Sequence, residues 1–460
     1  MMTMLSISPA LRKLSLRRAL AAVIATGCAL QAPSALALGL MQAYEAALRN
    51  DPTYQSAIHE NDAGQQNRLL GRSTLLPQVS ASYQTSKANA EITNISAAQG
   101  NNTINPRYTS TAAVLQVRQG LVNFDSLARY RQGIAQSNYS TALFGGRSED
   151  LIIRLVSAYA DAQFSEDQLA LVVAQRDAYG EQMRVNDRMF AKGEGTRTDS
   201  LETQAKFDLS QAQVIEAEDA LTTARNTLAG IVGMDVTVLD GLGADFKVRP
   251  MLPAGYPEWQ AIALERNSEI AALRFAVDST KQEIAKQRAG HYPKLDLVAS
   301  LEQNKSNTVN TFNQDSNVRS IGVQLSIPIY SGGYVNAATT QAVAQSEKAK
   351  SDLDAKISQV TIELRKQYSL TQSSAAHIDA LVKSVSSANL LVEATRQSIK
   401  GGVRINLDLL NAQQQTFAVR RDLAQSRYNY VLSYLRLRNA AGTLNSEDLQ
   451  NMAAYFVARK

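Results

Sequence analysis

Two long spans of the chain repeat apolar residues at every third or fourth position. In the first span they are Ile152, Leu155, Tyr159, Ala162, Leu169, Val173 and Met183, and in the second Ile357, Val360, Leu364, Tyr368, Leu381, Val385, Leu391 and Ile399. This spacing is typical of one face of a helix. All ten prolines lie outside residues 107–249 and 329–460, so neither span contains a helix breaker. A helix over 125–191 would extend about 100 Å.

Each long helical pattern is followed by a short polar turn and a second helical pattern. The turns are contained in KGEGTRTDSLETQ at 192–204 and in GGVRINLDLLNAQ at 401–413. Glycine favours chain reversal at the end of a helix, and threonine and aspartate favour the start of the next one. The sequence therefore predicts two long helical hairpins, over 125–232 and 333–441.

Shorter segments alternate apolar and polar residues, which predicts two strand hairpins, over 78–119 and 294–328. In one such segment Val79, Ala81 and Tyr83 alternate with Ser80, Ser82 and Gln84. Alternation over about ten residues is typical of outer-membrane β-barrels, although a soluble sheet with one hydrated face has the same pattern. Since the smallest barrels need about eight strands, four strands would have to pair with further copies of the chain. The pattern does not choose between two copies and three.

The same elements occur twice along the chain. AALRNDP at residue 46 returns as IALERNSE at 262, LLPQVSASYQ at 75 as HYPKLDLVASLEQ at 291, and QVRQGLVNFDS at 116 as QLSIPIYSGGY at 324. Internal repetition at a nearly constant offset indicates duplication of one structural unit. The predicted units are 38–247 and 248–460, each with a short helix, a strand hairpin and a long helical hairpin.

The first 37 residues have the pattern of a secretory signal peptide. Four cations without an acid precede the apolar run 19–30 and the cleavage-like tripeptide 35–37, ALA. Gly27-Cys28 leaves open the alternative of a lipoprotein site. Removal of this segment lowers the formal net charge from +5 to +1 and removes the one cysteine. The mature chain then has neither a charge that favours nucleic acid nor a thiol for catalysis or disulfides.

The residues that usually carry catalysis or hold cofactors do not form recognisable motifs. His59, His291 and His377 lack metal-ligand spacing, and the glycine-rich loops that bind phosphates or dinucleotides are missing. The sequence therefore predicts a protein that is not an enzyme and that holds no cofactor or metal.

The order of these elements, together with two segments, resembles the TolC family of outer-membrane channels. The segments are SRYNYVLSYLRLRNAAGTLNSEDLQ at 426–450 and the turn sequence at 401–413. The resemblance covers the whole mature chain. It implies a mainly α-helical homotrimer with membrane β-structure, in which a twelve-stranded β-barrel continues into a twelve-helix periplasmic α-barrel. Segments near 234–258 and 444–460 would form an equatorial belt.

The resemblance also implies a location, a function and partners. The protein would lie in outer-membrane lipid, extend into the periplasm, and serve as the exit duct for type I secretion or multidrug efflux. Its partners would be a periplasmic adaptor, or membrane fusion protein, and an inner-membrane ABC, RND or MFS transporter, without nucleic acid. A periplasmic coiled-coil adaptor or scaffold is the alternative, because such proteins also carry a long helical hairpin.

The family's periplasmic gate can be placed on residues of the two turns. The innermost ring of aspartates matches Asp408, whereas Asn411 occupies the position of a second acidic ring. The links between neighbouring hairpins match Arg404 with Thr198 and Asp199. Ile399 stands where a further family link uses tyrosine. Three Asp408 carboxylates would attract cations. From the residues alone, helix capping by Thr198 and Asp199 fits equally well.

Overall fold

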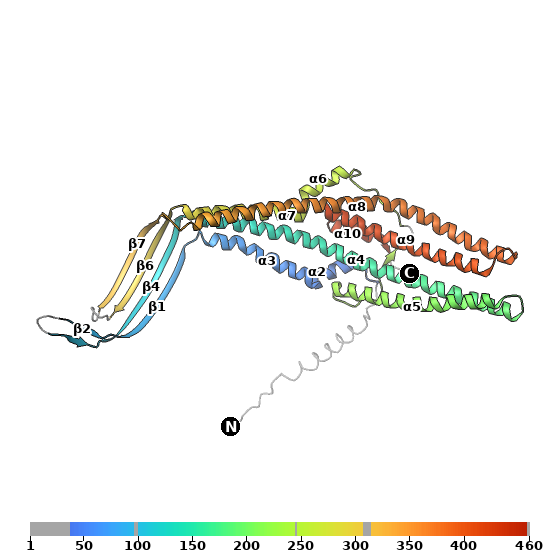
Figure 1. Ribbon diagram of the computed structural model, residues 1–460, viewed down its shortest axis with the longest axis horizontal. Coiled ribbons are helices and arrows are strands. Elements are labelled where there is room, and N and C mark those ends of the chain that lie inside the picture. The colour runs from blue at the N-terminus through green and yellow to red at the C-terminus, as the bar shows by residue number, and fades with distance from the viewer. Residues whose placement is uncertain (1–36, 96–99, 244–245, 307–313, 458–460) are drawn as a thin grey trace, which may run out of the picture.

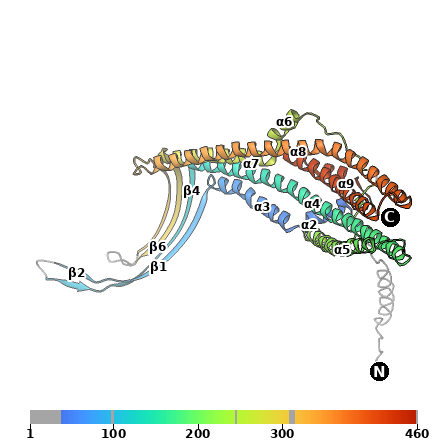
Figure 2. The ribbon, with the colours of Figure 1, turned by 45° about the vertical axis from the view of Figure 1, so that its right-hand side comes forward.

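A computed structural model describes residues 37–95, 100–243, 246–306 and 314–457. The molecule is elongated, with strands at one end and two helical hairpins at the other (Figure 1). The strands curve away from the axis of the helices (Figure 2). Cys28 and all of the predicted signal peptide except Ala37 lie outside the described residues.

Each half of the chain contains two shorter helices, two long strands and two long helices. The first half has α2 (Leu40–Asn50), α3 (Pro52–Ser73), β1 (Gln78–Asn89), β4 (Arg107–Val122), α4 (Phe124–Ala191) and α5 (Arg197–Val232). The second has α6 (Tyr256–Arg266), α7 (Ser268–Arg288), β6 (Lys294–Ser306), β7 (Gln314–Ser326), α8 (Tyr334–Lys400) and α9 (Asn406–Ala440). The shorter elements are β2 (Ile92–Asn94), β3 (Asn102–Ile104), β5 (Gly241–Leu242), the 3₁₀ helix η2 (Ala289–His291), α10 (Ser446–Ala453) and β8 (Phe456–Val457).

An equivalent side-chain cap begins the second helix of each half. The Asp51 side chain accepts a hydrogen bond from the backbone N–H of Thr53 at 2.9 Å at the start of α3. At the start of α7, Asn267 Oδ1 accepts from the N–H groups of Glu269 and Ile270 at 3.1 and 3.0 Å. A side chain that accepts from the first N–H groups satisfies donors that the helix itself leaves unpaired. The similarity of these joints follows from the repeated sequence.

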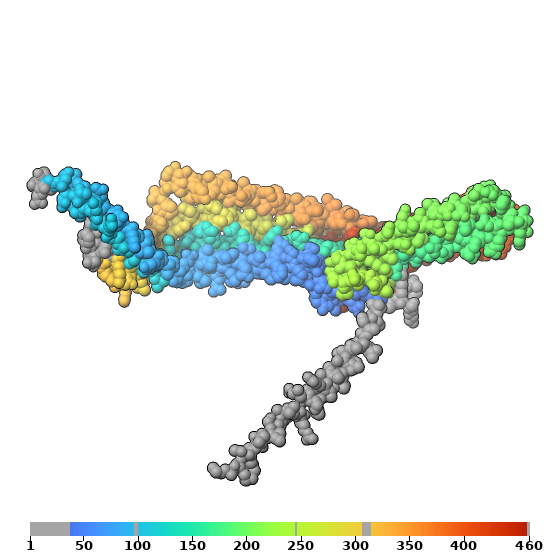
Figure 3. All heavy atoms as spheres, turned by 90° about the horizontal axis from the view of Figure 1, so that it is seen from below, coloured from blue at the N-terminus to red at the C-terminus, as the bar shows by residue number. Residues whose placement is uncertain are grey.

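The shaft of the molecule is formed by α3, α4, α7 and α8, with α2 and α3 lying between the sheet and α5 when seen from below (Figure 3). Glycines allow α3 and α4 to approach closely. A Cβ at Gly133 would lie 2.3 Å from the carbonyl oxygen of Asn67, and one at Gly71 would lie 2.7 Å from that of Arg129. None of the described helices contains a stretch apolar enough to cross a membrane.

Two apolar clusters hold the middle of the molecule together. The larger joins α2, α4, α5, α9, α10 and β8, with Leu155 and Tyr159 of α4 fully buried at its centre. The smaller surrounds Trp259, whose Nε1 donates to the carbonyl oxygen of Pro253 at 2.7 Å. Trp259 lies near the start of α6, where its buried side chain has a structural role. The C-terminal end of the chain contributes to this region through the pairing of β8 with β5.

The four long strands form one antiparallel sheet in the order β1-β4-β6-β7. Because side chains alternate between the faces of a sheet, its register defines an apolar face and a polar face. One row of the apolar face contains Val79, Val117, Ala299 and Ile321, and a neighbouring row of the polar face contains Ser80, Gln116, Ser300 and Ser320. Among the described residues, β1 and β7 each have one edge without a partner strand.

Candidate functional site

The tip of the first hairpin is closed by a reciprocal cap. Gly193 lies in the turn that follows α4 and has a positive φ of 77°. Thr196 is the N-cap of α5. Thr196 Oγ1 accepts from the N–H of Asp199 at 3.1 Å. Asp199 Oδ2 accepts in return from the N–H of Thr196 at 3.3 Å and from its hydroxyl at 2.5 Å. The carboxylate of Asp199 therefore takes part in the cap of its own helix, but its partner there is Thr196 and not Thr198.

The tip of the second hairpin has the same glycine turn but a different cap. Gly402 has a φ of 73°. The N-cap of α9 is Ile405, whose apolar side chain makes no capping hydrogen bond. Asp408 occupies the place that Asp199 has in the first tip, three residues after the N-cap. Among the described residues its carboxylate has no hydrogen bond or ion pair, so its charge is free to act on ions.

A cleft of about 660 Å³ lies between the two tips. Arg404 and Asp199 both line it, together with Ile399. Within the described part of the chain, Arg404 forms no ion pair with Asp199. Thr198 is exposed in the first turn of α5 and does not line the cleft. The structure thus brings two of the three residues of the predicted link to one cleft.

The two remaining gate residues lie in the first turns of α9. Asp408 is partly buried and Asn411 is exposed, one turn further along the helix. Cations gather on the side of the cleft formed by the second hairpin, where Arg396, Lys400 and Arg404 face Glu194 and Asp199 of the first. The cleft therefore places opposite charges on the two hairpins, which favours their approach.

A polar network that the sequence analysis missed joins the two hairpins beside this cleft. Asn406, the first residue of α9, accepts from Gln182 Nε2 at 2.9 Å and donates to Thr203 Oγ1 at 3.2 Å. Asn186 donates to the same hydroxyl at 2.7 Å. Asn186 and Thr203 are buried, so these bonds are shielded from water. The asparagine after the turn was the available signal, but a turn asparagine is too common to predict a contact across two hairpins.

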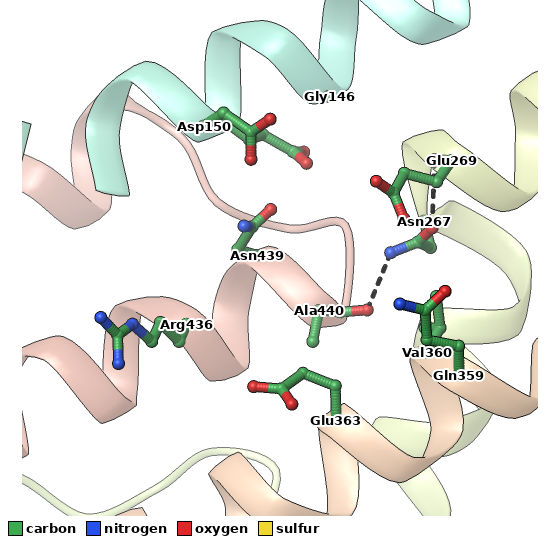
Figure 4. A pocket seen from close by; sticks show the side chains of 11 residues that line it. Gly146, Asp150, Asn267, Glu269, Gln359, Val360, Glu363, Arg436, Asn439 and Ala440 are labelled. Carbon is green, nitrogen blue, oxygen red and sulfur yellow. Dashed lines mark hydrogen bonds between the residues drawn. The ribbon is translucent and has the colours of Figure 1, made fainter. Parts of the chain in front are cut away.

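A second polar site lies halfway along the molecule, in a pocket of about 180 Å³ between α4, α7, α8 and α9. Figure 4 shows Asp150, Glu269 and Glu363 projecting from three helices toward the same space. Burial raises the pKa of the neighbouring Glu149 to about 8. The Ser268 hydroxyl, at 3.5 Å, opposes this increase in pKa, whereas the nearby carboxylates of Asp150 and Glu269 add to it. Glu149 is consequently protonated at neutral pH.

No group of three or more histidine, cysteine, aspartate or glutamate side chains in the described ranges has the arrangement of a metal site. The arrangement of the two polar sites, one at the tips and one in the middle of a long helical shaft, is that of a conduit or a scaffold.

Comparison with known proteins decides between a conduit and a scaffold. The model of a family described as outer membrane efflux protein matches residues 43–234 and 259–443. The chain belongs to this outer membrane efflux protein family. Both repeated units are matched, so the adaptor or scaffold alternative does not fit. The resemblance to the TolC family is confirmed.

Individual members of the family resemble the chain over nearly its full length. The alkaline protease secretion protein AprF of Pseudomonas aeruginosa is 43% identical over 92% of this chain and 88% of its own. The outer membrane protein TolC of Vibrio cholerae is 27% identical over 92% of this chain and 94% of its own. The crystal structure of the Campylobacter jejuni CmeC outer membrane channel has a TM-score of 0.74, with 16% identity, over 91% of this chain and 89% of that one.

Membership of this family fixes the location and the broad role of the protein. It is an outer-membrane protein that extends into the periplasm, and it serves as an exit duct through the outer membrane. Family members are channels, which confirms the prediction that the chain is not an enzyme.

Proposed function

We propose that the protein is the homotrimeric outer-membrane duct of a type I protein secretion system. The observation that carries this proposal is the four-stranded sheet with an apolar face and two unpaired edges in a member of a channel family. Three copies supply twelve strands for one lipid-embedded barrel, and their hairpins supply twelve helices for the periplasmic tunnel. Closure of the barrel removes the exposed edges.

Protein is the cargo favoured by the similarity to a protease secretion protein, AprF. The partners are then a periplasmic adaptor and an inner-membrane ABC transporter, which supplies the energy. Multidrug efflux with an RND or MFS transporter is the second candidate function, because the description of the matching family names efflux. The polar face of the sheet suits either cargo, because its exposed serine and glutamine side chains can contact proteins and polar drugs alike.

The tips are the periplasmic gate in this proposal. Three Asp408 carboxylates form a ring that attracts cations, and the neutral Asn411 adds no second ring. Arg404 of one hairpin links to Thr198 and Asp199 of a neighbouring hairpin through the forked donors of its guanidinium. Two features support this assignment: Arg404 and Asp199 line one cleft, and Asp199 Oδ1 takes no part in the cap described above.

Deletion of the gene tests the proposal at the level of cargo. The mutant strain should lose specific proteins from its culture medium while its drug sensitivity stays nearly unchanged, and a plasmid copy should restore secretion. Increased drug sensitivity with a normal secreted proteome would instead identify an efflux duct. Detergent extracts should contain trimers that resist heat, and a monomer released without detergent would contradict the proposal.

The gate is tested by Arg404→Ala in purified channels reconstituted in planar bilayers. Three identical links act together, so their loss should raise the resting ion conductance roughly tenfold, equivalent to about 1.4 kcal/mol of gate stability. Lys192→Ala is the matched control, because it removes an exposed cation from the other tip, outside the cleft. Wild-type conductance in Arg404→Ala channels would contradict the link.

A further inference from the structure

The apolar face of the sheet carries an unequal set of charges near the ends of the strands that lie farthest from the helices. The register places Lys87, Arg107, Lys305, Arg319 and Asp315 on this face, four cations and one carboxylate. All five side chains are exposed. Lys305 lies 3.5 Å from Asp315, whereas the other three cations have no ion pair with described residues. The excess of positive charge is therefore not neutralised by ion pairs within the described part of the chain.

Arg319 lies at the border between the apolar and polar parts of this face. Its row contains Ala81, Leu115 and Leu301, and the next row toward the helices contains Val79, Val117, Ala299 and Ile321. The next row in the other direction contains Tyr83 and Ala113 but also Gln303 and Asn317. Tyrosine is common where the apolar band of a barrel meets the membrane interface. The guanidinium of Arg319 thus lies close to that interface on the lipid side.

A shallow groove of about 310 Å³ adjoins Arg319. It is lined by Leu115, Val117, Ala299, Leu301 and Ile321, with the backbone of Ser300 and Ser320 between them. Apolar walls below a cation suit a molecule with hydrocarbon chains and an anionic group at one end. Phosphate oxygens can accept two hydrogen bonds at once from the planar fork of an arginine.

The other cations continue from Arg319 away from the helices. Lys305 is paired with Thr111, Lys87 with Thr109, and Arg107 lies two residues further along β4. Since a strand rises about 3.4 Å per residue, these positions extend roughly 27 Å along the strands from the row of Arg319. One phosphate cannot contact all of them, so several phosphate groups are needed.

We propose that this surface, Lys87, Arg107, Lys305 and Arg319 above the groove, binds phosphorylated glycolipids of the outer leaflet. The acyl chains lie along the apolar rows and the headgroup phosphates contact the cations. The inference rests on the proposed function, because it takes the apolar face as the lipid-facing side of the barrel and the strand ends as its outer rim.

The test measures lipid binding to the intact assembly by native mass spectrometry. The probes are a bisphosphorylated glucosamine lipid (lipid A) and phosphatidylcholine, with inorganic phosphate as competitor. Wild-type protein should bind lipid A at least fivefold more tightly than phosphatidylcholine, and the preference should decrease at high salt. Arg319→Gln should reduce it two- to fivefold, and the triple variant Lys87→Gln, Arg107→Gln, Arg319→Gln should abolish it.

Lys294→Gln is the matched control, since it removes one cation from the opposite face and the opposite end of the sheet. It should bind both lipids like wild type. If the triple variant does not assemble, Arg319→Gln and Lys87→Gln are compared singly. An unchanged preference in Arg319→Gln or the triple variant, no preference in wild type, or complete competition by inorganic phosphate would overturn the inference. Failure of wild type to form a membrane-inserted assembly in phosphatidylcholine would instead contradict the proposed function.

Discussion

The two hairpin tips have similar backbones, but the aspartates at their equivalent positions make different interactions. Asp199 and Asp408 each lie three residues after an N-cap, in the first turn of the returning helix. Thr196 engages Asp199 in a reciprocal cap, whereas the side chain of Ile405 has no hydroxyl with which to engage Asp408. A single difference at the N-cap therefore decides whether the carboxylate stabilises its own helix or remains free.

The long helices differ in a similar way. Counted from the first residue of each helix, Glu149 of α4 and Gln359 of α8 occupy the same position, and both line the central pocket. The first half thus contributes a titratable group where the second contributes a neutral amide. Duplication preserves the fold, while single substitutions divide the electrostatic roles between the halves.

Glu149→Gln gives α4 the amide that α8 has at Gln359, and it should have the largest effect on the free energy of unfolding. Because the pKa of Glu149 is raised to about 8, the folded state holds a proton that the unfolded chain releases at about pH 4. The free energy of unfolding of the wild type therefore falls as pH rises from about 4 to 8, and the variant should avoid this loss. The expected gain is near zero at pH 4 and at most about 5 kcal/mol above pH 8, at about 1.4 kcal/mol per pKa unit.

Thermal unfolding of the detergent-solubilised protein at pH 4, 6 and 9 measures this difference. Glu60→Gln, at an exposed position of α3, is the control and should not shift the curve. An equal gain at all three pH values would mean that packing, not protonation, causes the stabilisation.

Asp408→Asn and Asp199→Asn test whether the two equivalent carboxylates differ in function. Loss of the free Asp408 charge should lower the cation-to-anion permeability ratio roughly tenfold, because three copies would face one axis in the proposed trimer. Asp199→Asn should change the ratio little, since that carboxylate is engaged in its cap. Reversal potentials in a salt gradient report the ratio. Equal effects of the two substitutions would remove the distinction between the tips.

Asn406→Ala removes both hydrogen bonds that this residue makes to the first hairpin. Asn406 is only partly buried, so each bond contributes about 0.5 kcal/mol, the low end of the usual range, and the resting conductance should rise roughly fivefold. Gln415→Ala, an exposed amide on the same helix that lies further from the tip, serves as the control. Single-channel recordings distinguish the two, and unchanged conductance in Asn406→Ala would show that the polar network does not hold the tips together.

Replacement of the N-cap residues should have the smallest effect on stability and selectivity. Thr196→Ala should lower the free energy of unfolding by about 1 kcal/mol, the usual loss at a threonine cap. Ile405→Thr should raise it by about 0.5 kcal/mol and, by engaging Asp408, reduce cation selectivity slightly. Chemical denaturation and reversal potentials measure the two quantities. If Ile405→Thr leaves selectivity unchanged, the carboxylate of Asp408 is not controlled by its cap.

The sequence predicted the elements well because their signals are local. Proline-free apolar stripes, alternating strands and glycine turns each act through neighbouring residues, although the cap expected from Thr198 and Asp199 is formed by Thr196 and Asp199. Asn406 was missed because its partners, Gln182 and Thr203, lie more than 200 residues earlier in the chain. The protonation of Glu149 could not be predicted either, since it depends on burial between packed helices and on the carboxylates of Asp150 and of the distant Glu269.

The edge strands of the four-stranded sheet, β1 and β7, have a consequence for how the protein assembles. Helical hairpins rely on contacts close in sequence and can form rapidly in a solitary chain. In the proposed trimer the edges of β1 and β7 would pair only when further copies of the chain arrive, so the final step of assembly would depend on protomer concentration. A single chain would then reach the membrane with its helices formed and these two strand edges unpaired. A chaperone that covers these strand edges until the protein inserts into the membrane would prevent aggregation.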